Sequence, residues 1–209
     1  MGFDDSGEEV LRAIRDRHSI GKVLPEIPPR ELVERVLSAA VCAPNHYRTQ
    51  PWEFVVVTGA ARNRLGDVMA KSLHSRLPDA DGDEARQLIE RERRKPLRAP
   101  VVIAVAVRPS ENVKSVEIEE IAAVSACIQN MLLAAHALGL GAMWRTGQPA
   151  RDPRVKCFLG LRADSHLLAF VYLGYPDLPG VPHPDRDWES RTTWMTGGDI
   201  SDGWPDRVS

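Results

Sequence analysis

The longest apolar pattern of the chain extends from Ile118 to Leu138. This stretch contains neither Gly nor Pro, and its apolar residues recur at helical spacing on one broad face, while the opposite face is barely polar. A helix that is apolar nearly all round has to be covered on every side. The polar positions that argue against a membrane span are Glu117, Glu119, Glu120, Gln129 and His136. We therefore predict a central core helix that ends at Gly139 and Gly141, with small residues that would let a second subunit approach.

Shorter apolar runs predict the strands of a sheet. They cover Trp52 to Thr58, Val101 to Val107, Leu140 to Trp144 and Leu167 to Leu173. The first run is aromatic and β-branched, and it is continuous enough to indicate burial on both faces; the second is also fully apolar. The third run follows the central helix directly, so it would bring the residues from Trp144 to Thr146 to an edge of the sheet.

Periodic patterns predict further helices over residues 7–16, 29–41, 60–76 and 152–159. Another helix, from Asp83 to Lys95, is highly charged and has little apolar surface beyond Leu88 and Ile89. We interpret it as the main part of a peripheral lid over about residues 78–96. Because helices often follow one another without a strand between them, the pattern favours an α+β fold over a doubly wound sheet. The expected organisation is one domain over residues 1–195 and a C-terminal tail over residues 196–209.

Composition limits the function without identifying it. A length of 209 residues with 43% hydrophobic residues allows one domain with a sizeable core. The formal net charge of −2 leaves no basic field that would recruit nucleic acid or a membrane surface. Because Cys42, Cys127 and Cys157 form no CxxC pair and the N-terminus has no signal-peptide pattern, we expect a reduced, cytoplasmic setting.

Several common catalytic motifs are missing from the sequence. No GxGxxG follows a predicted strand, and no GxxxxGK followed by Ser or Thr occurs, which excludes a Rossmann fingerprint and a P-loop. The histidines are scattered without an HExxH motif, and GxSxG is absent, so neither a metal site nor a serine nucleophile is predicted. Candidate chemistry is therefore confined to polar clusters at the ends of the elements.

Three polar clusters could meet around one planar, anionic ligand. Arg17 and Ser19 suit a phosphate, but composition alone favours another role for Arg17, the compensation of a helix C-terminus. The loop from Asn45 to Gln50 offers amides and an imidazole to ring or sugar oxygens, and it is equally well explained as a capped turn. The residues from Trp144 to Thr146 form the third cluster, with a core aromatic beside a solvent-facing arginine as the alternative.

Short motifs follow one another along the chain in a specific order. Arg17-His18-Ser19-Ile20 comes first, and Ala43-Pro44-Asn45-His46 leads to Gln50-Pro51-Trp52 and the first predicted strand. Next come Ala99-Pro100, Leu138-Gly139-Leu140-Gly141, Phe158-Leu159-Gly160-Leu161 and Leu173-Gly174-Tyr175-Pro176. Each motif is weak by itself, but their order over residues 10–176 resembles the FMN-dependent nitroreductase family, and most of all its compact branch.

This resemblance implies a nitroreductase-like fold, a three-layer α/β/α sandwich with a mostly antiparallel sheet. It also implies a homodimer with two FMN molecules in clefts between the subunits, and residues 1–195 would be the FMN-binding domain. It implies three groups of cofactor-binding residues. At the phosphate and ribityl end are Arg17, His18 and Ser19, and along the isoalloxazine are Trp144, Arg145 and Thr146. The loop supplies Cys42, Asn45, His46 and Gln50, of which Cys42 and His46 come from the partner chain. The central helix gives an independent reason for a second chain, because one compact subunit cannot cover its apolar perimeter.

Two positions depart from the family pattern. Many relatives have a basic residue two positions after the serine, close to N1 and O2 of the flavin, where negative charge gathers on reduction; here that position is Gly21. Either Lys22 or Arg145 could supply the charge, and we choose Arg145 because its turn is anchored by the central helix and a strand. His18 stands where the family has a second arginine, which weakens the grip on the phosphate.

The implied function is that of an FMN-dependent oxidoreductase with a ping-pong mechanism. NADH or NADPH would give hydride to flavin N5 and leave, and an electron-poor acceptor such as a nitroaromatic or a quinone would take its place. The flavin carries the chemistry, so no side chain is assigned a catalytic role. The alternatives are an FMN-binding storage or sensor protein without turnover, and a relative that breaks down flavin or removes halogens. The expected partners are a second copy of the chain and a small-molecule acceptor, with neither nucleic acid nor membrane.

Overall fold

A four-stranded antiparallel sheet forms the centre of the molecule. The computed structural model describes residues 5–111, 114–177 and 187–195. The strands are β1 (Trp52–Thr58), β2 (Val101–Val107), β3 (Gly141–Arg145) and β4 (His166–Gly174). They lie in the order β1-β2-β4-β3, and every neighbouring pair is antiparallel. This arrangement confirms the α+β class, and it leaves β1 and β3 at the two edges of the sheet.

The two most continuous apolar runs form strands that differ in burial. Every residue of β2 is buried, because β2 pairs with β1 on one side and β4 on the other and has helices above and below. β1 is only partly buried, and the side chain of Val56 is exposed. The prediction for β1 is wrong because helices do not fully cover the faces of this edge strand, and Val56 lines an open hollow beside α2.

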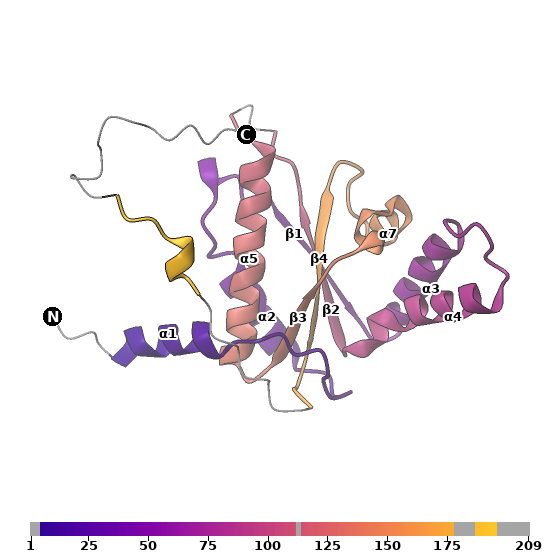
Figure 1. The fold of residues 1–209 in the computed structure, drawn as a ribbon, viewed down its shortest axis with the longest axis horizontal. Coiled ribbons are helices and arrows are strands. Elements are labelled where there is room, and N and C mark those ends of the chain that lie inside the picture. Colours follow the sequence, from indigo (N-terminus) through magenta and orange to yellow (C-terminus); the bar gives the residue numbers. More distant parts are fainter. Residues whose placement is uncertain (1–4, 112–113, 178–186, 196–209) are drawn as a thin grey trace.

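Helices cover both faces of the sheet and make three layers (Figure 1). α2 (Arg30–Ala40) and α5 (Glu117–Ala137) share a hydrophobic cluster with one face. α3 (Ala61–His74), α6 (Gln148–Arg151) and α7 (Pro153–Phe158) share a second cluster with the other face. The α/β/α sandwich is therefore confirmed.

The central helix α5 is covered on one side in the single chain. Val124, Ile128 and Met131 are fully buried against α2 and the sheet, whereas Ile118 is 69% exposed and Ala122 is also exposed. By length and hydropathy α5 could cross a membrane, the one such helix in the described ranges, but its packing in this core accounts for its composition. Burial on every side, as the sequence predicts, would need a second chain.

α4 (Asp83–Arg94) forms an antiparallel hairpin with α3 and extends away from the sheet (Figure 1). The two helices touch through their backbones, since a Cβ built at Gly66 would lie 2.1 Å from the carbonyl oxygen of Arg93. The 3₁₀ turn η2 (Lys95–Arg98) then returns the chain to β2. The predicted lid region is thus fixed at its C-terminal end, and its movement stays a prediction.

The segment after α1 (Asp5–Asp16) docks on the edge of the sheet where β3 begins and β4 ends. The Ile20 N–H donates to the carbonyl of Ala142 at 3.0 Å, and the Leu24 N–H donates to the carbonyl of Tyr175 at 2.8 Å. This close approach requires Gly141, because a Cβ there would meet Ile20 Cγ2 at 2.9 Å. Residues 20–24 therefore hold the end of α1 beside β3.

Most predicted boundaries agree with the structure to within one or two residues. The helix predicted over residues 152–159 is confirmed as α7, which Asp152 caps by accepting from the Arg154 N–H, and α6 is a further short turn that precedes it. Short 3₁₀ turns also occur at η1 (His46–Arg48) and η3 (Glu189–Arg191). The predicted tail over residues 196–209 lies outside the described residues.

Candidate functional site

A pocket of about 280 Å³ opens beside β3, on the face of the sheet that α3 covers. Its lining residues are Met69, Lys95, Met143, Trp144, Arg145, Thr146, Pro149, Phe170 and Tyr172. Three of the residues predicted from the sequence, Trp144, Arg145 and Thr146, are thus in one wall. Aromatic rings and thioethers make up most of the remaining surface, and the two charged groups are cations.

Arg145 is held against this wall by the strand pairing and by an aromatic ring. Its register partner in β4 is Phe170, and its guanidinium carbon lies 5.4 Å from the centre of the Tyr172 ring. Burial raises the pKa of Tyr172 to about 12, although the positive charges of Arg145 and Arg98 act in the opposite direction. Tyr172 therefore stays a neutral phenol near pH 7 and offers Arg145 the face of its ring.

The guanidinium of Arg145 lies next to Gly21. A Cβ built at Gly21 would be 3.7 Å from Nη2 of Arg145 and 3.3 Å from Sδ of Met143. Lys22 is directed elsewhere, because its Nζ forms an ion pair with Asp177 at 2.7 Å. A cation therefore does stand close to position 21, and it belongs to Arg145.

Among the pocket residues that the sequence analysis did not propose, Lys95 is the charged one. It follows directly after α4, and its Nζ donates to Oε2 of Glu92 at 2.6 Å. Glu92 is 8% exposed, and its Oε1 is buried with no hydrogen-bond partner among the described residues. In the sequence both residues belong to a charged run that is typical of a solvated helix, and only the packing of the end of α4 near β3 brings Lys95 into the pocket.

Arg17, His18 and Ser19 lie close to this pocket in the chain path. They precede Ile20, which bonds to β3, and Gly21, which lies against Arg145. Arg17 and His18 are partly buried, and Nδ1 of His18 is 2.7 Å from the carbonyl oxygen of Asp16. Ser19 is exposed. The first cluster is thus next in sequence to the residues that contact β3, but none of its three side chains lines the pocket.

The second cluster lies at the opposite end of α5. His46 contacts Glu119 in the first turn of α5, whereas Ile20 contacts the strand that follows its last turn. A helix of 21 residues is about 30 Å long. The lining of the pocket that contains Arg145 includes none of Cys42, Asn45, His46 and Gln50 of the same chain.

The predicted loop residues hold one another in a compact turn. The Gln50 N–H donates to Oδ1 of Asn45 at 3.0 Å, and Nδ2 of Asn45 donates to the carbonyl of Ala43 at 3.5 Å. The thiol of Cys42 is exposed and donates to the carbonyl of Ser38. His46 and Gln50 are exposed, so the loop presents polar side chains outward.

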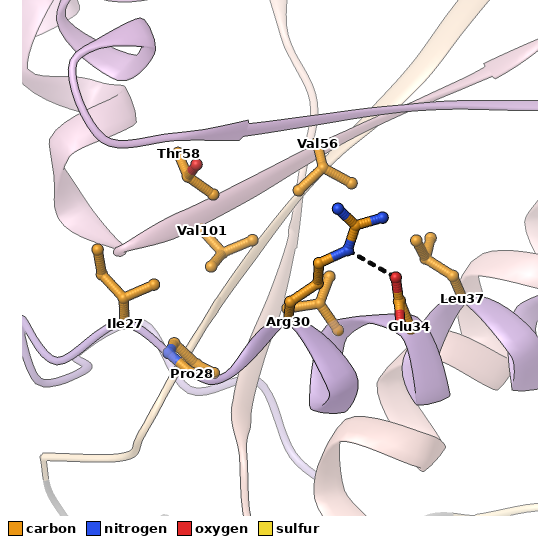
Figure 2. Close-up of a pocket in the computed structure, with 9 residues that line it drawn as sticks. Ile27, Pro28, Arg30, Glu34, Leu37, Val56, Thr58 and Val101 are labelled. Carbon is orange, nitrogen blue, oxygen red and sulfur yellow. Dashed lines mark hydrogen bonds and ion pairs between the residues drawn. The ribbon is translucent and has the colours of Figure 1, made fainter.

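A larger apolar hollow of about 490 Å³ lies elsewhere, between the start of α2 and β1 (Figure 2). Ile27, Val56 and Val101 line it, and Nε of Arg30 contacts Oε1 of Glu34 at its rim at 2.7 Å. None of the predicted site residues is in its wall. Its charged residues Arg30 and Glu34 pair with each other, so the smaller pocket beside β3, with its cations, is the better candidate for chemistry.

The described ranges contain no group of three or more His, Cys, Asp or Glu side chains that could hold a metal ion. The apolar walls and two cations of the pocket suit a planar, negatively charged molecule.

Comparisons with known proteins agree on one family. The sequence pattern of the nitroreductase family matches residues 14–175. The chain is 31% identical over 181 residues to YdjA, a candidate NAD(P)H nitroreductase of Escherichia coli K12, across 84% of this chain and 96% of that protein.

Solved structures share the fold. The nitroreductase-like family protein from Bacillus cereus superposes with a TM-score of 0.75 at 24% identity, covering 90% of this chain and 96% of that one. A candidate nitroreductase from Desulfovibrio desulfuricans, solved in complex with FMN, gives a TM-score of 0.67 at 27% identity, covering 94% and 98%. The extent of these matches, together with the order of the motifs, shows that this chain belongs to the nitroreductase family.

Proposed function

We propose that this protein is an FMN-dependent oxidoreductase that uses NADH or NADPH to reduce electron-poor acceptors such as nitroaromatics and quinones. The observation that carries the proposal is the pocket beside β3, where Arg145 and Lys95 lie among aromatic and thioether side chains. Family membership and the names of the relatives support the same activity, since YdjA is named for NAD(P)H and the Desulfovibrio structure contains FMN.

The residues of the pocket fit a flavin nucleotide. Its ring system is planar and apolar, which suits the walls from Met69, Met143 and Phe170. Trp144 has a buried Nε1 without a hydrogen-bond partner among the described residues, and a buried donor of this kind favours a ligand with acceptor atoms. The two cations suit the negative charge of a reduced flavin and of a phosphate.

In this proposal, each group of residues has its own part. Arg17, His18 and Ser19 hold the phosphate and ribityl end, and Trp144, Arg145 and Thr146 orient the ring, with Lys95 as a second cation. FMN, when bound, supplies the two-electron transfer from the nicotinamide to the acceptor. The protein excludes water and stabilises charge, so it needs no acid or nucleophile of its own. The two substrates use the open face in turn, which is a ping-pong order.

The site is shared between two subunits. In one chain the loop with Cys42 and His46 lies beside the first turn of α5 and does not line the pocket. A second chain therefore supplies these residues to the cleft. The uncovered side of α5, with exposed Ile118 and Ala122, supports such an association. Residues 1–195 then form the FMN-binding domain of each subunit.

The experiment is an anaerobic spectrum of the purified protein, loaded with FMN, before and after NADPH or NADH is added. Loss of the visible flavin absorbance and its return with a nitroaromatic or a quinone are expected. A flavin spectrum that neither nucleotide changes would indicate a storage or sensor protein. A protein that retains no FMN would contradict the proposed cofactor.

A further inference from the structure

The loop between α2 and β1 has an unusual backbone. Three residues with side chains have a positive φ within four positions: Tyr47 (53°), Arg48 (53°) and Gln50 (47°). The left-handed region is unfavourable for residues that carry a Cβ, and such strain persists where the surroundings enforce it, often at functional sites. Glycine would adopt this backbone without strain, yet these three positions carry side chains.

The ring of His46 is held from two sides in this loop. Its Nδ1 lies 2.7 Å from Oε2 of Glu119, and the Tyr47 ring stacks on it with centroids 3.9 Å apart and planes at 19°. An ionised carboxylate only accepts hydrogen bonds, so this contact places a proton on Nδ1. Nε2, on the other side of the ring, has no hydrogen-bond partner in the part of the chain that the structure describes.

The held imidazole lies at the uncovered side of α5. A shallow hollow there is lined by Pro44, Asn45, His46, Glu119, Ala122, Ala123 and Ala126. The side chain of His46 is 56% exposed in the single chain. In the proposed function the second subunit covers this surface. Nε2 of His46 in one chain can therefore face the cleft of the other chain.

We propose that Glu119 is a positioning residue for the cofactor site of the second subunit. It fixes His46 as the tautomer with a proton on Nδ1, which leaves Nε2 of the neutral ring as a hydrogen-bond acceptor for a hydroxyl or a ring N–H of the flavin nucleotide. This inference rests on the proposed function, because it needs the shared cleft. Glu119 itself does not touch the cofactor.

The chain contains a matched control on the same helical turn. Oε1 of Glu117 contacts Nε2 of His166 at 3.1 Å, which is a second His–Glu pair at the start of α5. That pair ties α5 to the first residue of β4, away from the loop. Removing either carboxylate deletes one acid from the first turn, so the effect on the helix dipole is the same for both.

The test compares FMN affinity, measured by quenching of flavin fluorescence, in four proteins: the wild type, Glu119→Ala, Glu119→Gln and Glu117→Ala. We expect Glu119→Ala to weaken FMN binding roughly threefold to tenfold, as expected for the loss of an orienting hydrogen bond. Glu119→Gln should recover most of the affinity, because its amide oxygen accepts the same bond. Glu117→Ala should change the affinity less than about twofold.

A second measurement reads the tautomer directly. ¹⁵N NMR of labelled histidines should show His46 with its proton on Nδ1 in the wild type, and with its proton moved toward Nε2 in Glu119→Ala. Unchanged FMN affinity in Glu119→Ala, an equal loss in Glu117→Ala, or a proton on Nε2 in the wild type would each overturn the inference while FMN binding by the wild type still stands. A wild type that binds no FMN would overturn the proposed function and this inference together.

Discussion

The side chain of Arg145 reaches the space that a longer residue at position 21 would take. Gly21 and Arg145 are neighbours, and Arg145 lies on the Tyr172 ring in the pocket wall, while Lys22 is paired with Asp177. The sequence suggests this substitution of one cation for another, and the geometry favours Arg145 over Lys22. The role of Arg145 toward the flavin is the first prediction.

Replacing Arg145 by Ala should lower the reduction potential of bound FMN and slow its reduction by NAD(P)H. A cation about 4 Å from a reduced flavin, partly screened by solvent, contributes roughly 1–2 kcal/mol, or about 20–40 mV for a two-electron couple. Potentiometric titration measures the shift, and Lys22→Ala is the control that should leave the potential unchanged. If Arg145→Ala instead raises the KM for NADPH with the potential constant, Arg145 binds the nucleotide.

Replacing Arg17 by Ala should weaken FMN binding roughly tenfold or more, because hydrogen bonds to charged groups contribute about 1.5–3 kcal/mol. Fluorescence titration gives the affinity. Arg15→Ala is a suitable control, since Arg15 is exposed on α1 and contacts Glu8. Equal affinity of the Arg17 variant and the wild type would place the phosphate elsewhere.

The three cysteines should differ in reactivity. Burial raises the pKa of the Cys127 thiol to about 12, so almost no thiolate is present at pH 8. Cys42 and Cys157 are exposed. In the native apoprotein a disulfide reagent should therefore modify Cys42 and Cys157 rapidly and Cys127 only after unfolding. Peptide mapping after labelling identifies the sites, and fast native labelling of Cys127 would contradict the buried position.

At the scale of elements, the sequence predicts the framework better than the pocket. The apolar runs locate the four strands of the sheet, because short apolar runs bounded by turn residues are typical of buried strands. The prediction of a charged peripheral helix agrees with most of α4. It does not foresee that Glu92 is buried and that Lys95 lines the pocket. The strain at Tyr47 and Arg48 also has no signal in the sequence, because residues of these types usually avoid a positive φ.

The contact between α3 and α4 gives the prediction at this scale. Gly66→Ala should destabilise the protein by about 1–3 kcal/mol, because its Cβ would meet the backbone carbonyl of Arg93 and push the hairpin apart. Urea unfolding measures the loss, and hydrogen exchange should show faster opening of α4 than of β2. Gly7→Ala in α1 is the control, since nothing lies within 4 Å of its added methyl group.

At the scale of the whole molecule, exposed apolar surface indicates a partner. Val10, Leu11 and Ile14 on α1 are exposed, as is Ile118 on α5. Sedimentation at micromolar concentration should therefore give about twice the chain mass of 23.2 kDa. A stable monomer that carries FMN would contradict the shared cleft, in which His46 of one chain and Arg145 of the other serve the same flavin.

The docking of residues 20–24 sets the order in which the pocket can form during synthesis. These residues leave the ribosome before their partners, because the carbonyl groups that hold them belong to Ala142 and Tyr175, far later in the sequence. Contacts between residues so distant in sequence form late. Arg17, His18 and Ser19 therefore remain without a fixed position until β3 and β4 have been made, so a ribosome-bound fragment that ends before β4 should show no affinity for the flavin nucleotide.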